Sequence, residues 1–447
     1  MGPSQPVYDT SAAGYYEWPG NLLTSADNPV AILGLATDRG TTYRSIGNVQ
    51  ATYRLPFLDA LRANVNLGYD VARADRQTFR PSVLHDQTKT GNDGSDYRSN
   101  FSQVNTVLES YLNYAALLNA VPGNIDVTAG YSYSQSHAEY PWYLASGLST
   151  DLLGGSGVTS ARTVQNSQDI QESKLISLFG RVSYNLSDRY LAAVSLRRDK
   201  SSRFGSGKAW GTFPAISLGW RLSQEPFMRG LTSVSDLKLR YSWARTGNQA
   251  FANYVQYAAY QAGDAQTQVQ FGDQFVSTIR PGAYNDQIAW EPTGATNIGL
   301  DFGFLNQRFS GSIDWYTKNT DDLIFTVPVA AGTNLSNFAT ANIGSMRNRG
   351  IELSLSARVL QGGARGLSWT ADFTAARNTN ELVTINPIYG DSIALQRILT
   401  GLVAGGVGTF VQVLEPGQPL NSFYVYEHIR DASGNPIYED RQGLSNG

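Results

Sequence analysis

The sequence predicts an all-β chain that forms part of a large antiparallel transmembrane β-barrel, with short turns at one end and long loops at the other. Three observations carry this prediction. Apolar and polar residues alternate with a period of two. Many of the predicted strands are expected to be about ten residues or more, which suits a tilted crossing of a bilayer. Short and long connections alternate along the chain, as they do in outer-membrane barrels.

Four segments show the alternation most clearly: 237–243, 298–304, 309–315 and 367–375. In each, one set of alternate positions is apolar except at Gly311, and the other set holds no large apolar residue. A strand with one apolar and one polar face produces this pattern, whereas a helix breaks it within two turns. Weaker alternation predicts further strands within 49–55, 61–69, 108–114, 125–131, 176–184, 190–196, 216–222 and 351–359.

The connections between these strands fall into two classes. Tight connections join Leu55 to Leu61, Leu186 to Tyr190, Phe304 to Phe309 and Leu360 to Leu367. Long connections are uncommon in compact soluble domains, and here they alternate with the tight ones. A soluble β-sandwich has shorter strands and no such difference between its ends, so the pattern favours a barrel. The long connections are expected at about 71–103, 135–173, 198–212, 247–293, 318–348 and 379–420.

Composition excludes several classes of protein. The 447 residues include no Cys, only three His and 16% charged residues, and 11% are aromatic. Low charge with many aromatics argues against a disordered chain, and the lack of Cys excludes a disulfide scaffold. A net charge of −3 gives no electrostatic case for nucleic-acid binding. The start of the chain shows no secretory signal, and no apolar run is long enough for a membrane helix.

Candidate catalytic and metal motifs are weak. Gly205 to Lys208 lacks the upstream Gly and the following Ser or Thr of a phosphate loop. Asp321 and Asp322 are adjacent, so on a strand they would face opposite sides. The three His are far apart in sequence and are expected to be solvated loop residues. The sequence therefore predicts a protein that is not an enzyme, with no metal and no cofactor.

Aromatic residues gather in two ways. Several lie near strand ends, where amphipathic rings favour the lipid headgroup level and form girdles; ordinary strand propensity explains part of this. Others are expected in loops, where flat rings could stack on sugar faces or pack within the loop. These candidate substrate-binding residues are Tyr15, Tyr16, Trp18, Tyr140, Trp142 and Tyr143.

Ordered motifs across about residues 28–440 resemble those of SusC-like (SusC/RagA) TonB-dependent outer-membrane transporters. The family's Asp-Gly-Ser-Ser-Arg-Phe segment is matched by 199–204, with Lys at position 200, and its Phe-Pro-Ser and Gly-Trp segments by 213–220, with Ala at position 215. Further matches are 239–249, Trp290-Glu291 before 297–301, 315–324 and 348–353.

The resemblance implies a family barrel of about 22 strands, of which this chain would supply about 12 to 14. It implies import of glycans, oligosaccharides or peptides across the outer membrane of a Gram-negative-type bacterium. The implied partners are membrane lipid, a SusD-like lipoprotein lid, and the TonB complex through an N-terminal region. No stretch resembles the family's plug domain or its TonB-engaging segment, so a barrel fragment without its plug is expected.

The expected organisation has three parts. Residues 1–45 form an extracellular-loop or barrel-entry segment, 46–378 form the barrel strands with long loops, and 379–447 form a long loop and a further, truncated barrel segment. Two alternatives stay open: a smaller passive porin or adhesin barrel, and a soluble β-rich binding domain. In the barrel, polar alternate positions face the lumen, either lining it or pairing with a plug: Lys238, Arg240, Asp301 and Asp372.

Overall fold

The computed structural model describes residues 5–10, 14–18, 25–118, 122–262, 268–328, 338–362, 366–385, 397–403, 409–430, 433–434 and 436–439. The chain divides into two compact units. Unit 1 comprises Met1–Thr52, Asn64–Ser110 and Ser132–Leu175, and unit 2 comprises Tyr53–Ala63, Tyr111–Tyr131 and Ile176–Gly447. None of the helices in the described ranges has the length and apolar character needed to cross a bilayer.

Twelve strands form one sheet in the order β1-β2-β3-β4-β5-β6-β7-β8-β13-β14-β17-β18. Each of the strands predicted from alternation lies in or overlaps one of them, so the all-β prediction is confirmed. The bounds are β1 Thr37–Arg54, β2 Leu61–Arg80, β3 Ser95–Leu118, β4 Gly123–Ser146, β5 Thr163–Leu186, β6 Tyr190–Ser201, β7 Trp210–Arg221, β8 Val234–Asn248, β13 Glu291–Phe304, β14 Phe309–Thr320, β17 Gly344–Leu360 and β18 Trp369–Ile385.

Short elements occupy the connections. The helical ones are α1 (Pro29–Leu35), α2 (His85–Thr90), η1 (Gly154–Ser160), η2 (Leu222–Gln224) and η3 (Pro226–Met228). The short strands are β9 (Tyr260–Ala262), β10 (Gln268–Phe271), β11 (Gln274–Ser277), β12 (Ile279–Pro281), β15 (Ile324–Pro328), β16 (Phe338–Asn342), β19 (Ile398–Leu402), β20 (Phe410–Leu414), β21 (Ser422–Phe423), β22 (Glu427–Arg430) and β23 (Pro436–Glu439).

The strands are longer than the alternation predicts, and two expected loops are correspondingly wrong. β3, β4 and β5 each have 24 residues. The expected loops at 71–103 and 135–173 shrink to 81–94 and 147–162. The physical reason is that polar residues occupy both faces there, as in Ser134–His137 and Gln165–Asp169, so the alternation disappears while backbone pairing continues. β1 also begins at Thr37, within the range expected to be an entry segment.

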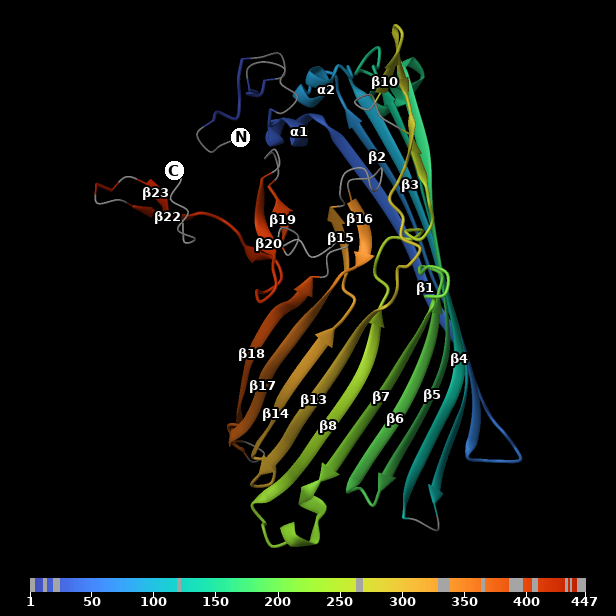
Figure 1. The fold of residues 1–447 in the computed structure, drawn as a ribbon, viewed down its shortest axis with the longest axis vertical. Helices are drawn as coiled ribbons and strands as arrows, with labels where there is room; N and C mark the ends of the chain where they lie inside the picture. Colours follow the sequence, from blue (N-terminus) through green and yellow to red (C-terminus); the bar gives the residue numbers. More distant parts are fainter. Residues whose placement is uncertain are drawn as a thin grey trace. The chain divides into compact units, whose positions relative to one another are not determined.

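In unit 2 the two ends of the strands differ, as Figure 1 shows for β6, β7, β8, β13, β14, β17 and β18. Tight turns lie at one end, and the connection after β8, residues 249–290, leaves from the other. The turn between β5 and β6 has φ of 54° at Ser187 and 57° at Asp188. Two successive positive φ values identify a type I′ turn, whose twist matches that of the flanking strands.

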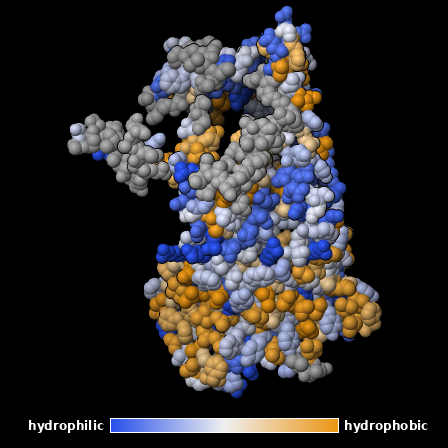
Figure 2. Space-filling view, in the orientation of Figure 1, coloured by the Kyte–Doolittle hydropathy of each residue, from blue (hydrophilic) through white to orange (hydrophobic). Residues whose placement is uncertain are grey.

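The apolar face of the unit 2 strands is exposed. Figure 2 shows hydrophobic residues gathered in a belt over the turn-side part of β8, β13, β14, β17 and β18. Residues of this belt retain about two fifths or more of their surface, including Leu239 (40%), Ile313 (43%) and Phe373 (56%). A soluble protein rarely exposes so large a continuous apolar surface, whereas a lipid-facing wall requires one.

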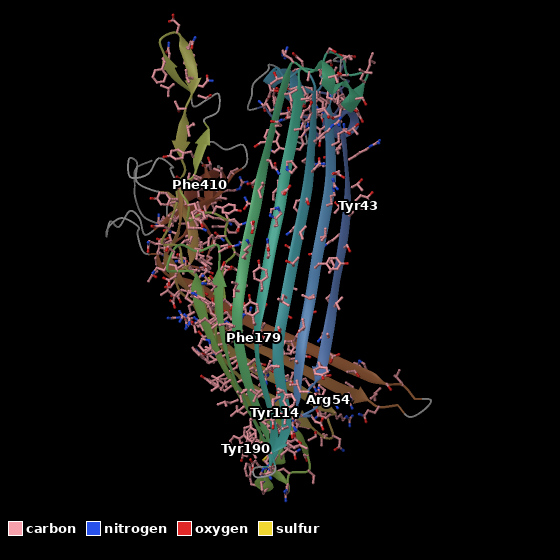
Figure 3. All side chains as sticks on the ribbon, turned by 90° about the vertical axis from the view of Figure 1, so that its right-hand side faces the viewer. Tyr43, Arg54, Tyr114, Phe179, Tyr190 and Phe410 are labelled. Atoms are coloured by element: carbon pink, nitrogen blue, oxygen red, sulfur yellow. The ribbon has the colours of Figure 1, made fainter. Side chains whose placement is uncertain are left out.

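Aromatic side chains lie at two levels along the unit 2 strands. On the turn side, Tyr190 and Trp220 are cross-strand partners with their rings stacked at 6.4 Å, and Figure 3 shows Tyr114 and Tyr190 toward that end. Farther along, Trp243 and Trp315 are exposed at 36% and 42%. From Phe309 to Trp315 the strand advances by roughly 20 Å, at about 3.4 Å per residue. This spacing suits two girdles on either side of an apolar band.

A buried carboxylate braces the turn end of unit 2. Glu225 lies between η2 and η3 and is 6% exposed. It accepts hydrogen bonds from the Tyr190 hydroxyl at 2.6 Å and from Trp220 Nε1 at 2.9 Å. The Tyr190 bond, followed by that of Trp220, lowers the pKa of Glu225 below its ordinary value of 4.5.

We expect Glu225→Gln to lower the thermal unfolding temperature at neutral pH and to reduce acid sensitivity. Because the folded-state pKa of Glu225 is lowered, its contribution is full above the ordinary carboxyl pKa and is lost as the pH falls through the lowered value. Melting curves of both proteins between pH 7 and pH 3 should therefore converge on the acid side. The control is Asp59→Asn, at an exposed turn position; a pH-independent gap between Glu225→Gln and wild type would contradict the expectation.

Candidate functional site

The strand register in unit 2 aligns apolar residues into continuous rows. Leu239 pairs with Leu300, Leu300 with Ile313, and Ile313 with Leu353. Cross-strand partners lie on the same face of a sheet. A single apolar row therefore crosses β8, β13, β14 and β17, and the large side chains beside it are exposed, among them Ile298 at 43% and Ile351 at 54%.

The alternate positions form polar rows on the opposite face. Lys238 pairs with Asp301, Asp301 with Ser312, Ser312 with Ser354 and Ser354 with Thr374. Asp372 pairs with Ser356 and so shares this face. The four residues predicted from alternation as lumen-facing thus lie on one face, opposite the apolar row. Their exposure to a lumen stays a prediction.

A charge network lies in the middle of the polar face. Arg240 donates to both oxygens of Asp301, with Nε to Oδ2 at 2.8 Å, and through Nη2 to Asp314 Oδ2 at 3.0 Å. These side chains are 17–31% exposed. The guanidinium lies over Gly299, where an added Cβ would come within 2.6 Å of Arg240 and 2.5 Å of Asp314. Gly299 therefore makes room for the pairing.

The polar face of unit 2 is hollowed beside this network. A cavity of about 890 Å³ is lined by residues of β3 to β8 and β13. Larger side chains such as Leu191 line it together with the charged Asp126, Arg181, Lys238 and Arg240. Arg181 and Lys238 bring positive charge to the cavity wall. The arrangement offers charged groups for polar ligands or polypeptide, and its residues do not form a constellation of nucleophile and base.

Residues of the motifs that resemble SusC-like transporters come together in the loops of unit 2. The Phe204 and Trp290 rings lie 4.5 Å apart, Phe213 lies 5.2 Å from Trp290, and Phe251 lies 5.3 Å from Phe204. Trp290 is 8% exposed, and its Nε1 donates to the carbonyl oxygen of Ala209 at 3.1 Å. This aromatic cluster joins the connections after β6 and β8 to the start of β13.

Arg203 ties the same loops together by its side chain. Its Nη1 donates to the carbonyl oxygens of Phe251 at 2.7 Å and Gln249 at 3.2 Å. Burial lowers the pKa of the guanidinium from its usual value. Gly247 leaves room for the Phe213 ring, because a Cβ there would lie 2.4 Å from it. The motif residues of this region are thus structural contacts that hold loop positions.

A second hydrophobic cluster lies among the loops of unit 2. Leu323, Val327 and Ile343 of the β15–β16 region pack with residues of β18 and β20. These are among the most buried apolar residues of the described chain, with Leu382 of β18 at 0% exposure. Buried apolar side chains are therefore found among these loops, whereas the large apolar side chains of the unit 2 strands are exposed.

Five of the six predicted substrate-binding aromatics form ring contacts in unit 1. Tyr15 lies 5.6 Å from Tyr8, and Tyr16 lies 6.4 Å from Trp18. Tyr140 contacts Phe101 at 5.2 Å, and Trp142 contacts Tyr97 at 6.3 Å. The expectation that Tyr140, Trp142 and Tyr143 lie in a loop is wrong, because β4 continues through them to Ser146.

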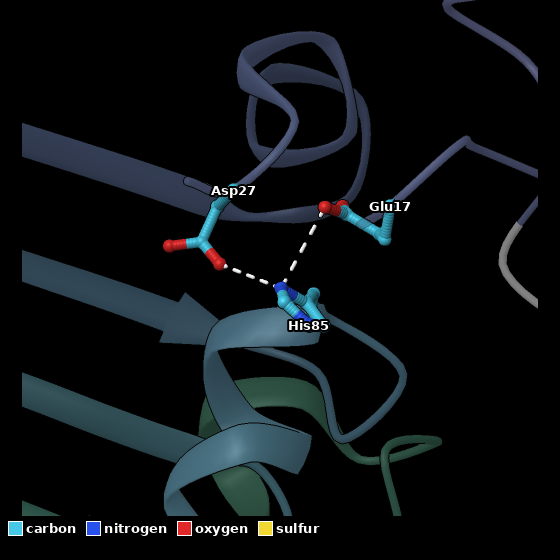
Figure 4. Close-up of side chains that lie close together, drawn as sticks. All are labelled: Glu17, Asp27 and His85. Carbon is cyan, nitrogen blue, oxygen red and sulfur yellow. Dashed lines mark hydrogen bonds and ion pairs between the residues drawn. The ribbon is translucent and has the colours of Figure 1, made fainter. Parts of the chain in front are cut away.

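Two of the three histidines are not the solvated loop residues that the sequence predicts. His137 lies within β4 and is partly buried. His85 begins α2 in unit 1, is 8% exposed, and binds Asp27 Oδ1 through Nδ1 at 3.0 Å. Glu17 Oε2 lies 3.7 Å from the same nitrogen, as Figure 4 shows. Lys89 of the same helix binds Asp27 Oδ1 at 2.7 Å. Sequence spacing gives no signal for this cluster, since its acids lie 58 and 68 positions from His85.

The two carboxylates of this cluster have shifted acidity. Burial raises the pKa of Glu17, opposed by a hydrogen bond from the Asn28 backbone. For Asp27, burial acts in the same upward direction, but the hydrogen bonds from Lys89 and His85 outweigh it and lower its pKa.

Comparisons with known proteins give one consistent result. A family model described as TonB-dependent receptor-like, beta-barrel, matches residues 3–407. The chain is 33% identical over 432 residues to the TonB-dependent receptor SusC of Bacteroides thetaiotaomicron, covering 94% of this chain and 41% of that protein. It is 28% identical over 434 residues to the TonB-dependent receptor P3 of Formosa agariphila, covering 95% and 41%. The chain therefore spans less than half the length of these relatives.

Solved structures agree on the fold. The RagAB peptide transporter structure superposes with a TM-score of 0.75 at 21% identity, covering 95% of this chain and 46% of that one. The same transporter in an open state gives a TM-score of 0.73 at 20% identity, with 96% and 46% covered.

Proposed function

The chain belongs to the TonB-dependent receptor-like β-barrel family, and from that premise we propose that it forms part of the wall of an outer-membrane importer. In this role the apolar row through Leu239, Leu300 and Ile313 meets lipid. The polar row through Lys238, Arg240 and Asp301 faces the lumen. The observation that carries the proposal is the strict separation of these rows across paired strands.

The cargo we propose is a glycan, an oligosaccharide or a peptide. The relatives support this class, since one is a SusC receptor and the fold neighbour is named a peptide transporter. Energy would come from the TonB complex through an N-terminal region, and a SusD-like lipoprotein would cover the loops. Since the chain spans 41% of its relatives, the plug, the TonB-engaging segment and the remaining strands would belong to the rest of a longer protein.

The loop and strand aromatics are the proposed substrate contacts. Tyr15, Tyr16, Trp18, Tyr140, Trp142 and Tyr143 present flat rings on partly exposed surfaces, with Tyr140 at 43% and Trp18 at 37% exposure. Rings of this kind stack on sugars and bind peptide side chains. Trp18→Ala or Trp142→Ala should weaken cargo binding in titrations of the full-length protein with oligosaccharides and peptides. Unchanged affinity for every bound cargo would remove these residues from the binding site.

The proposal that the apolar row faces lipid and the polar row faces water predicts opposite environments for neighbouring residues. The chain has no Cys, so Leu239→Cys or Lys238→Cys in an otherwise Cys-free full-length protein accepts one spin label. In bilayers, the label at 239 should be more accessible to oxygen than to a water-soluble relaxant, and the label at 238 should show the reverse. Equal accessibility at the two positions would contradict the assigned faces, and water exposure at both would favour a soluble β-rich domain.

A further inference from the structure

Unit 1 contains a mixed cluster of imidazole and carboxylate groups that the import function does not use. Glu17 and Asp27 come from the segment before β1, and His85 and Lys89 come from α2. One ligand atom from each of Glu17, Asp27 and His85 lies within 4.8 Å of the others. Figure 4 shows the Asp27 and Glu17 carboxylates directed at the same imidazole nitrogen.

The donor set and its spacing fit a transition-metal cation. Zn²⁺ binds imidazole nitrogen at about 2.0–2.1 Å and carboxylate oxygen at about 2.0–2.2 Å, so tetrahedral ligand atoms lie roughly 3.3–3.5 Å apart. The His85 Nδ1 distances are 3.0 Å to Asp27 Oδ1 and 3.7 Å to Glu17 Oε2. These two values lie on either side of the tetrahedral spacing, so movements of well under 1 Å would complete the geometry.

The cluster is largely buried. The side chains of His85, Lys89, Glu17 and Asp27 are 7%, 10%, 19% and 24% exposed. The neighbouring Asp86 of α2 is paired with Arg80 and is not part of the cluster. Buried carboxylates are costly unless they are paired or bound to a metal.

Oxygen atoms at this position already bind a positive group. Lys89 Nζ binds both Asp27 Oδ1 at 2.7 Å and the Ser25 carbonyl oxygen at 2.9 Å, so oxygen atoms already converge on a positive group. His85 Nε2 is fully buried without a hydrogen-bond partner in the described chain. The imidazole is therefore oriented by what Nδ1 contacts.

We propose that Glu17, Asp27 and His85 form a binding site for a divalent transition-metal cation, with Zn²⁺ the best fit. Imidazole nitrogen selects Zn²⁺ and its neighbours over Ca²⁺ and Mg²⁺, which prefer oxygen ligands alone. The Ser25 carbonyl or water supplies the fourth ligand. The bound metal clamps the segment before β1 onto α2 and so fixes one part of unit 1 against another.

The first test is calorimetric titration of the metal-stripped full-length protein with Zn²⁺ and with Mg²⁺ at pH 7.5. One Zn²⁺ should bind per chain, and Mg²⁺ should not compete at equal concentration. His85→Ala and Glu17→Gln should each weaken Zn²⁺ binding at least tenfold. The matched control is His137→Ala, because His137 also lies near two carboxylates, Glu139 at 3.1 Å and Glu172 at 3.8 Å, but at 36% exposure.

The Lys89→Met variant distinguishes a metal site from a cluster held by ion pairs alone. Its result can be interpreted even if His85→Ala or Glu17→Gln does not fold. Removing the competing ammonium should tighten Zn²⁺ binding about tenfold if the acids and His85 are ligands. Binding that is weaker in Lys89→Met, equal in His85→Ala, or missing in the wild-type protein would overturn the proposal. Loss of binding in His137→Ala alone would also overturn it, because it would assign the ion to the other histidine.

Discussion

Replacing Ile313 by Lys is expected to prevent stable insertion of the full-length protein into the outer membrane. Ile313 lies in the middle of the apolar row, paired with Leu300 on one side and Leu353 on the other, and is 43% exposed. A lysine on the lipid face near the bilayer midplane costs about 2–4 kcal/mol in a transmembrane barrel. That is a large share of the stability of a folded protein.

The matched control is Ser312→Lys, one residue away on the polar face. Ser312 pairs with Asp301 and Ser354, so a lysine there meets a carboxylate and should be tolerated. The measurement is the amount of heat-modifiable, folded protein in purified outer membranes, with urea unfolding of what is recovered. If both variants insert to the wild-type level, or both fail, the two faces do not differ and the lipid-facing assignment is wrong.

Trp290→Ala should release the loops that follow β6 and β8. Trp290 is 8% exposed, packs against Phe204 and Phe213, and donates to Ala209. Truncating a buried Trp typically costs about 3–5 kcal/mol. The loss should be local, because the strand ladder of β8 and β13 does not depend on the ring.

Hydrogen exchange of the full-length protein tests this prediction. Backbone amides at 202–209 and 249–256 should exchange much faster in Trp290→Ala, with those of β13 little changed. The control is Trp210→Ala. Trp210 is 42% exposed, and two cations lie over its ring, Arg198 at 4.8 Å and Lys200 at 5.8 Å from the centroid. An exposed cation–π pair contributes about 0.5–1 kcal/mol. Equal acceleration in both variants, or none in either, would show that the cluster does not hold the loops.

The strands could be predicted from sequence because their signal is local. The alternation of apolar and polar residues depends only on neighbouring positions in the sequence. Strands such as those at 298–304 and 309–315 can therefore be recognised without knowledge of the fold. The ends of the strands could not be predicted, because Ser134–His137 keep their ladder bonds where no apolar face exists to mark them. The prediction of a loop at Tyr140, Trp142 and Tyr143 is wrong for the same reason.

The candidate sites also differ in whether the local sequence is enough to predict them. The shared face of Lys238, Arg240, Asp301 and Asp372 follows from strand period and was accessible to sequence reasoning. The meeting of Glu17 and Asp27 with His85 was not, because it depends on how a segment and a helix far apart in sequence pack. The convergence of Phe204 on Trp290 lies between these cases, since the motifs were recognisable but their contact required the fold.

The period-two rows also limit how such a chain can change over generations. Inserting a single residue in β13 ahead of Asp301 would exchange the two rows beyond that point and move Asp301 to the apolar face. Insertions in 249–290 leave every row in register, and exposed connections tolerate length changes well. Gene-level insertions and deletions should therefore accumulate at the loop ends and be purged from the wall. A lineage can in this way change its loops while inheriting the same strand frame.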